Sequence, residues 1–180
     1  MEPKPKRGKA LREGFSTGSV AAAAAKAATA ALLTGAHQTE VNIALPIGRR
    51  VTFAVNACRI GEGLARCSVI KDAGDDPDCT HGAEIFAEIR LRSEPGVSID
   101  GGEGVARVTK PGLGIDIGLP SITRVPRKMI TESVTEALTA AGHPGAARPQ
   151  QQQGEHLRNP AVFPERSGAA GATRLCGYGH

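Results

Sequence analysis

A run of alanines constrains the fold of this chain more than any other feature. Residues 20–33, VAAAAAKAATAALL, predict a helix whose side chains are small on every side, so that neighbouring backbones can approach it closely. Such a helix suits burial against a sheet better than a surface position with one apolar stripe. The preceding segment offers Thr17 or Ser19 as a helix cap, and Gly35 is placed to end the helix in the left-handed conformation.

After this helix the apolar pattern changes to that of strands. Residues 40–45 and 50–55 flank a Pro-Ile-Gly-Arg turn and predict a hairpin, and residues 64–71 predict a third strand. The alternation EIFAEIRLR in residues 84–92 predicts a half-buried strand with one wet face. Residues 96–109 then predict a glycine-rich turn between two short β-type segments.

Residues 111–120 are rich in glycine and proline and predict irregular chain, and Pro126 sits where a second helix begins its first turn. Apolar residues recur beyond it at helical spacing: Met129, Ile130, Val134, Ala137, Leu138 and Ala141. The fold class predicted is therefore α/β with α+β character, a mixed sheet of short strands with two main helices.

The length of 180 residues fits one domain of ordinary size. Residues 1–13 are basic and proline-bearing and predict a flexible arm, and residues 14–141 predict the ordered domain. Residues 142–180 are rich in Gly, Pro, Gln and Arg and keep no regular apolar period, so we expect them to be disordered or to be a frame-shifted tail.

The charge pattern argues against nucleic acid as a partner. The net charge is +4, but the basic excess lies in the two ends of the chain, and aromatic residues make up only 3%. A nucleic-acid binder needs a basic face and stacking side chains.

Residues 20–33 are interrupted by Lys26 and are too short to cross a bilayer, so no membrane association is expected. The four cysteines form no CxxC pair and indicate reduced thiols in a cytoplasmic protein.

Residues 71–83, KDAGDDPDCTHGA, form an acidic segment that no ordinary strand or helix would contain. Asp72, Asp75, Asp76 and Asp78 repel one another at neutral pH, so a folded loop needs backbone donors, a cation or basic groups to offset the repulsion. Asp72, Asp76 and Asp78 could supply oxygens to calcium or magnesium, but the calcium-loop pattern is incomplete.

Successive Asx turns are the alternative interpretation of the acidic segment, with Thr80 capping a short turn that carries His81, and we favour turns over a metal site. A neutral imidazole beside carboxylates could serve as a base. A metal-dependent hydrolase is disfavoured because no His-rich ligand set accompanies the aspartates.

Two further glycine-bearing segments are candidate binding loops. Ser16, Thr17, Gly18 and Ser19 precede the alanine helix, where free N–H groups attract an anion, although a plain helix cap also explains them. The other segment is a turn that either approaches a ligand or simply joins two strands. It contains Gly101, Gly102, Glu103 and Gly104, with Arg107 and Lys110 beyond it as partners for an acidic substituent.

Four segments in order resemble the amino-terminal half of the CbiD family, the cobalt-precorrin-5B C1-methyltransferases of cobalamin synthesis. They read LREGFSTGSVAAAAAKAA, KDAGDDPDCTHGA, IDGGEGVARVTKPGLGI and VPRKMI. The resemblance covers residues 10–140 and implies the first domain of a normally two-domain fold. It implies S-adenosylmethionine-dependent methylation of ring carbon C-1 of a cobalt-bearing tetrapyrrole, to give cobalt-precorrin-6A.

The resemblance also implies roles for the three loops. The carboxylate-fringed tetrapyrrole would bind at residues 16–19 and Lys110, with the 101–104 turn near the ligand. The catalytic candidates in the acidic segment are Asp72, Asp75, Asp76 and His81. That segment could lie near the sulfonium, hold the substrate edge through its N–H groups, or deprotonate the macrocycle.

The chain departs from the family pattern in three places. Val20 stands where the family commonly has a cysteine, and Thr123 and Arg124 replace the family's Asn-Pro before VPR. The family's second half, with a GGISILGTTG-like segment, has no counterpart after residue 141. We therefore expect a half-protein with impaired activity. The alternative is a non-catalytic tetrapyrrole-binding half or subunit, working with a separately encoded second half or as a homo-oligomer.

Overall fold

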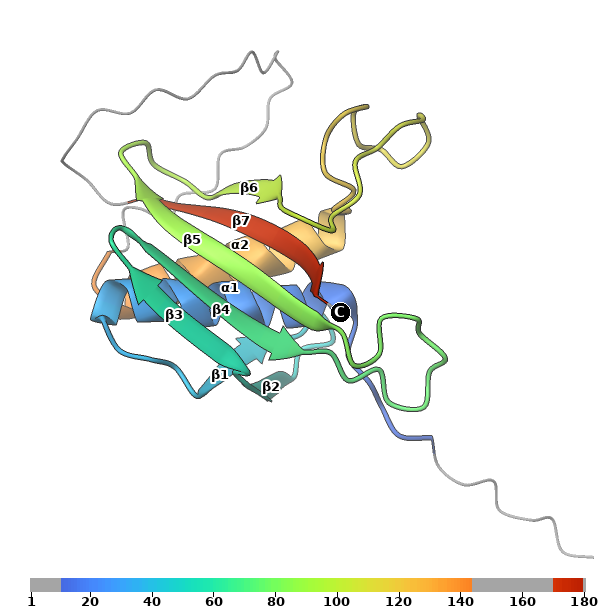
Figure 1. Ribbon diagram of the computed structural model, residues 1–180, viewed down its shortest axis with the longest axis horizontal. Helices are drawn as coiled ribbons and strands as arrows, with labels where there is room; N and C mark the ends of the chain where they lie inside the picture. Colours follow the sequence, from blue (N-terminus) through green and yellow to red (C-terminus); the bar gives the residue numbers. More distant parts are fainter. Residues whose placement is uncertain (1–10, 144–169, 180) are drawn as a thin grey trace, which may run out of the picture.

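The structure is a computed structural model that describes residues 11–143 and the backbone of residues 170–179. Figure 1 shows two helices and seven strands in the order of the chain. The helices are α1 (Thr17–Thr34) and α2 (Arg124–Ala140). The strands are β1 (Glu40–Ala44), β2 (Arg50–Ala54), β3 (Ala57–Gly61), β4 (Leu64–Ile70), β5 (Glu84–Arg92), β6 (Ser98–Gly101) and β7 (Ala170–Gly179).

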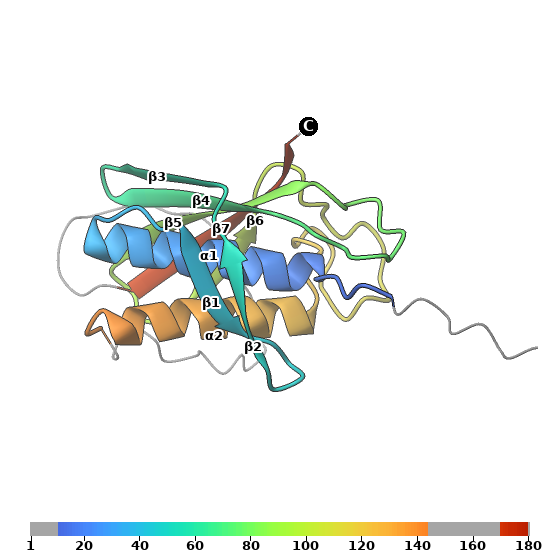
Figure 2. The same cartoon turned by 90° about the horizontal axis from the view of Figure 1, so that it is seen from below.

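The strands form two sheets. β1 and β2 are an antiparallel hairpin, and the larger sheet has the order β3-β4-β5-β7-β6. Its pairs are antiparallel except for β6 and β7, which run parallel. Both helices lie on the same face of the larger sheet, and the hairpin crosses beside them (Figures 1 and 2). The predicted mixed sheet with two helices is confirmed.

Helix α1 is buried along most of its length, as its alanine-rich sequence predicts. Ala22, Ala23, Ala24 and Ala25 are all fully buried, and α1 packs against β4 and β5 on one side and α2 on the other. Small side chains on every face let the neighbouring backbones approach α1 closely. Gly35 ends the helix with a φ of 67°, and its N–H donates to the carbonyl of Ala31, as expected.

The cap of α1 differs from the prediction. The helix begins at Thr17, so Ser16 is the cap, and its side chain accepts a hydrogen bond from the N–H of Ser19. The prediction of Thr17 or Ser19 as the cap is wrong because the helix starts earlier than the apolar run. A cap must precede the first helical residue to reach the N–H three positions on.

Helix α2 turns its apolar stripe toward α1 and the core. Met129, Ile130, Val134, Ala137 and Leu138 are buried as their spacing predicts. The stripe ends before Ala141, which is half-buried and caps the helix. A charged cluster adds a polar contact between the helices, because Lys26 of α1 lies 2.9 Å from Glu136 of α2.

The predicted hairpin and the predicted strands at 64–71 and 84–92 are present as β1, β2, β4 and β5. The strand β3 has no counterpart among the predictions, because its short sequence, ACRIG, lacks a clear alternation. The backbone of residues 170–179 forms β7 between β5 and β6, which differs from the disorder expected there. Residues 1–10 and 144–169 lie outside the described residues, and with them most of the predicted arm and tail.

Candidate functional site

Three loops gather at one end of the molecule. The amino-terminal end of α1, the acidic segment between β4 and β5 and the irregular chain before α2 all lie at this end in two perpendicular views (Figures 1 and 2). The loop ends of a scaffold held by packed helices and strands are common places for binding and catalytic residues. The four segments that resemble one family therefore share one region of the fold.

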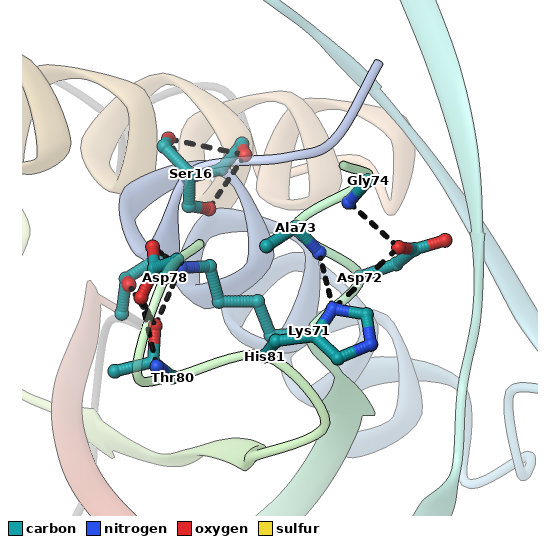
Figure 3. A network of polar contacts seen from close by, with 10 residues as sticks. Ser16, Lys71, Asp72, Ala73, Gly74, Asp78, Thr80 and His81 are labelled. Atoms are coloured by element: carbon teal, nitrogen blue, oxygen red, sulfur yellow. Dashed lines mark hydrogen bonds and ion pairs between the residues drawn. The ribbon is translucent and has the colours of Figure 1, made fainter. Parts of the chain in front are cut away.

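Lys71 is the centre of a polar network within the acidic segment (Figure 3). Its side chain is fully buried, and its ammonium donates hydrogen bonds to the carboxylate of Asp78 and the hydroxyl of Thr80. The N–H of Thr80 donates to the same carboxylate at 2.8 Å. The hydroxyl of Thr80 lies 3.4 Å from that of Thr17, so the network reaches the first turn of α1.

This network stabilises the ionised form of Asp78. Hydrogen bonds from Lys71 and Thr80 hold the pKa of Asp78 well below its ordinary value of 3.8. Asp78, which is 32% exposed, thereby gives the fully buried side chain of Lys71 a negative partner. The ion pair joins the first residue of the acidic segment to its middle, and the backbone of Lys71 joins the two ends by hydrogen bonds with Ala83 and Gly82.

Asp72 is engaged by the amino-terminal segment. The guanidinium of Arg12 donates to both of its oxygens, at 2.9 Å for Nη2 and Oδ1, and the N–H of Gly74 donates to Oδ1 at 2.9 Å. These contacts, with Arg12 foremost, lower the pKa of the Asp72 carboxyl. The backbone N–H of Arg12 also donates to Asp75. Arg12 thus lies against the domain, although the arm is predicted to extend to residue 13.

His81 accepts a hydrogen bond at Nδ1 from the N–H of Ala73, at 3.1 Å. In the neutral imidazole this contact places the proton on Nε2. The lone pair of Nδ1 is therefore occupied by the loop's own backbone. His81 Nδ1 lies 3.9 Å from Asp72, which is longer than a hydrogen bond.

Two glycines permit the amino-terminal segment to cross the acidic segment. A Cβ at Gly14 would lie 1.9 Å from the carbonyl carbon of Ala73, and a Cβ at Gly74 would lie 2.2 Å from the carbonyl oxygen of Arg12. Gly74 also has a φ of 64°. The N–H of Phe15 donates to the carbonyl of Asp72 at 2.7 Å at this crossing. Glycine is required on both segments because no side chain fits between the two crossing backbones.

Glycines allow a close approach at two other contacts. A Cβ at Gly18 would lie 2.8 Å from Cγ of Pro126, so the first turns of α1 and α2 touch there. A Cβ at Gly101 would lie 2.9 Å from Cβ of Pro120. Residues 14–19 therefore contact both the acidic segment and the first turn of α2, through Gly14 and Gly18.

The 101–104 turn is less constrained. Gly101 is buried, Gly102 is half-buried, and Glu103 and Gly104 are exposed, with the N–H of Val105 donating to the carbonyl of Gly102 at 3.2 Å. Arg107 donates to the carbonyl of Gly118 at 2.9 Å and lies 3.4 Å from Asp100. Lys110 is exposed and has no salt-bridge partner among residues 11–143.

The hydroxyls of Ser16 and Ser19 satisfy the helix start itself. Ser16 Oγ accepts from the N–H of Ser19 at 3.2 Å, and Ser19 Oγ donates to the carbonyl of Ser16 at 2.8 Å. The N–H groups of Thr17 and Gly18 have no acceptor within the described part of the chain. These amides, rather than the serine hydroxyls, remain available for an anion.

The acidic segment consists of turns, as favoured from the sequence. Asp72 and Asp78 each accept the N–H two residues on, which is the pattern of an Asx turn. No group of three or more His, Cys, Asp or Glu side chains among the described residues is arranged to hold a metal ion. Of the four catalytic candidates, Asp76 alone has a side chain without a hydrogen bond or ion pair within those residues.

Sequence reasoning left Lys71 and Arg12 out of the site, and assigned Asp78 only to a possible metal site or a turn. A single lysine at the end of an apolar strand gives no periodic signal of burial. The position of Lys71 close to four aspartates in the sequence is the one signal that indicates a charged partner for its ammonium. Arg12 lies 60 residues from Asp72 along the chain, and no local pattern predicts such a pair.

Within the described residues, neither helix is long and apolar enough to cross a membrane.

The model of the CbiD family matches residues 4–153 of the chain. A cobalt-precorrin-5B C(1)-methyltransferase of Geobacillus kaustophilus is 56% identical over 134 residues, covering 74% of this chain and 36% of that protein. The protein of the same name from Leptospira interrogans is 46% identical over 170 residues, covering 94% and 46%.

A solved structure has a similar fold. It is the crystal structure of a cobalamin biosynthesis protein (cbiD) from Archaeoglobus fulgidus, with 25% sequence identity and a TM-score of 0.55. The match covers 92% of this chain and 43% of that chain. The chain thus spans less than half the length of the relatives it matches.

Proposed function

Because the chain belongs to the CbiD family, we propose that it takes part in methylation of C-1 of cobalt-precorrin-5B, giving cobalt-precorrin-6A, with S-adenosylmethionine as methyl donor. The observation that carries the proposal is the meeting of the family-like segments at the start of α1, through Thr17 with Thr80, Gly14 with Ala73, and Gly18 with Pro126. A cytoplasmic location belongs to the same proposal, because the solved relative is named as a cobalamin biosynthesis protein.

The substrate would bind by its carboxylate edge. A cobalt-precorrin carries acetate and propionate groups around a flat ring, so a binding face needs donors spaced along one edge. The amides of Thr17 and Gly18 lack acceptors in the described part of the chain, and the dipole of α1 favours an anion there. Lys110 offers an exposed ammonium in the chain between β6 and α2. These groups fit a carboxylate better than they fit a cation.

S-adenosylmethionine would supply a methyl group on a positively charged sulfur. Asp76 in the acidic segment and Glu103 in the 101–104 turn are exposed carboxylates, and their charge suits a cation nearby. Asp72 is a weak base because Arg12 lowers its pKa, and Nδ1 of His81 already accepts the Ala73 N–H. Alignment of the ring carbon with the methyl group would therefore supply more of the rate than proton transfer.

A second candidate function is binding without catalysis. It is favoured by the coverage of 36% to 46% of the curated relatives, since residues beyond that part would have to complete the active site. In this case the chain would bind the tetrapyrrole and act with a separately encoded second half or as a homo-oligomer.

The test is to incubate the purified protein with cobalt-precorrin-5B and S-adenosylmethionine labelled in its methyl group. We expect the protein to bind the tetrapyrrole, and methyl transfer by this chain alone to be slower than by a full-length relative. Thr17→Pro removes one of the free amides at a helix position that tolerates proline. It should weaken tetrapyrrole binding, whereas Thr139→Ser, at the far end of α2, should not. Binding that is absent in the wild-type protein would overturn both candidate functions.

A further inference from the structure

Two cysteines face each other in the hairpin formed by β3 and β4. Cys58 and Cys67 are register partners on the two antiparallel strands, and their sulfurs lie 2.9 Å apart. Cys79, in contrast, is exposed in the acidic segment and has no sulfur partner among the described residues. The sequence contains no CxxC pair, but the strand register brings Cys58 and Cys67 together.

The surroundings give the two thiols different access to solvent. β3 is the edge strand of the five-stranded sheet, and Cys58 on it is half-buried. Cys67 is 1% exposed and points into the core with Ala65 and Val69 of the same strand. Burial, with the contact to Cys58, raises the pKa of Cys67. A reagent from solvent therefore meets Cys58 first.

We propose that Cys58 and Cys67 form a reversible dithiol site that takes a small-molecule disulfide, such as oxidised glutathione, as its oxidant. The Cys58 thiolate attacks one sulfur of the small disulfide, which forms a mixed disulfide and releases one thiolate. Cys67 then gives its proton to solvent or to the released thiolate, and its sulfur attacks Cys58 Sγ, expelling the second thiolate. The two protein thiols lose two electrons in total, and the oxidant becomes two small thiols.

The register favours the second step. Cys58 and Cys67 are directly opposed and their sulfurs already lie 2.9 Å apart, so the strands keep their register when the bond forms. The attack on Cys58 is intramolecular and should outrun attack by free small thiols by at least about tenfold. The bond would join edge strand β3 to β4, and an excess of reduced glutathione would reverse it.

The experiment uses the full chain in glutathione buffers with an increasing oxidised fraction, followed by alkylation of free thiols and peptide mapping by mass spectrometry. We expect a Cys58–Cys67 cross-linked peptide in the wild-type protein and in Cys79→Ser, lost again in reduced glutathione. In the wild type the mixed disulfide at Cys58 should amount to a tenth of the cross-linked form or less.

Two variants separate the steps. Cys67→Ser should stop at a glutathione adduct on Cys58, and Cys58→Ser should leave Cys67 unmodified for far longer than Cys79 in the same sample. Far-ultraviolet circular dichroism checks folding, and Cys67→Ala replaces Cys67→Ser if the buried hydroxyl prevents it. The proposal is overturned if both cysteines remain open to alkylation in oxidised glutathione. It is equally overturned if the wild type accumulates the Cys58 adduct, or if Cys58 links to Cys79 instead.

Discussion

Helix α1 and the acidic segment touch at Thr17 and Thr80, yet they are held in place by different forces. The helix is fixed by close packing of alanines, which lose no hydrogen bonds when buried. The acidic segment is fixed by directed contacts among charged groups, with one buried lysine at their centre. Packing tolerates changes of pH and salt, whereas the polar network depends on the ionisation of two aspartates. A region that tolerates changes of pH and salt, helix α1, therefore lies next to a region that responds to them, the acidic segment.

The largest effect should come from the packed region. Leu138→Ala removes a fully buried side chain of α2 from the core and should lower the free energy of unfolding by about 2–5 kcal/mol. Leu113→Ala is the matched control, because Leu113 is 56% exposed, and it should cost about 0.5 kcal/mol or less. Denaturant unfolding of both variants measures the difference. Equal losses would show that the helices do not form the stable core.

The alanines of α1 should resist enlargement. Ala24→Leu adds side-chain volume at a fully buried position and should cost about 1–3 kcal/mol. Ala140→Leu adds the same volume at an exposed position near the end of α2 and should be nearly neutral. Thermal unfolding followed by circular dichroism compares the two. A tolerated leucine at position 24 would mean that α1 is not held by close contact.

The polar network should respond to acid, with a smaller effect because the Asp78 side chain is 32% exposed and water can solvate it after Lys71 is lost. The pKa of Asp78 is lowered in the folded state, so its stabilisation is complete above its ordinary value of 3.8 and is lost as the pH falls further. Lys71→Met should be less stable than the wild type at neutral pH, and the gap should close in acid. Denaturant unfolding across this pH range measures the gap.

Lys128→Met is the control for Lys71→Met, because Lys128 is exposed and pairs with Glu132 at 3.7 Å on the surface of α2. Its difference from the wild type should be small at every pH. If the Lys71→Met gap stayed constant into acid, the loss would come from packing and not from the ion pair.

The smallest effect should come from the charged cluster formed by Glu136, Lys26 and Arg50. Burial alone would raise the pKa of Glu136, but Lys26 at 2.9 Å and Arg50 at 2.6 Å outweigh it and lower the pKa. The carboxylate is 43% exposed, so Glu136→Gln should cost only about 0.2–1 kcal/mol. Added salt should reduce that loss further. A loss of stability as large as that of Leu138→Ala would contradict the expectation that core packing stabilises the fold more than this exposed ion pair.

The same contrast explains what the sequence could predict. The buried alanine helix, the β1–β2 hairpin and the presence of β5 follow from local periodicity, which depends on which face a residue presents. The single wet face expected of β5 is wrong in part, because Phe86 on that face is buried and Leu91 on the other is exposed. The acidic segment could be predicted as turns because aspartate bonds its own neighbours. The pairing of Arg12 with Asp72, and of Cys58 with Cys67, depends on how distant segments are brought together, and periodicity holds no information about that.

The crossing of Gly14 over Ala73 and Gly74 has a consequence for the order in which the molecule folds. Contacts between residues about 60 positions apart carry a high closure entropy and form only after intervening structure has shortened the distance. The amino-terminal segment can close over the acidic loop only once α1 lies on the sheet. We therefore expect the proposed binding end to be the last part of the domain to gain protection from hydrogen exchange during refolding.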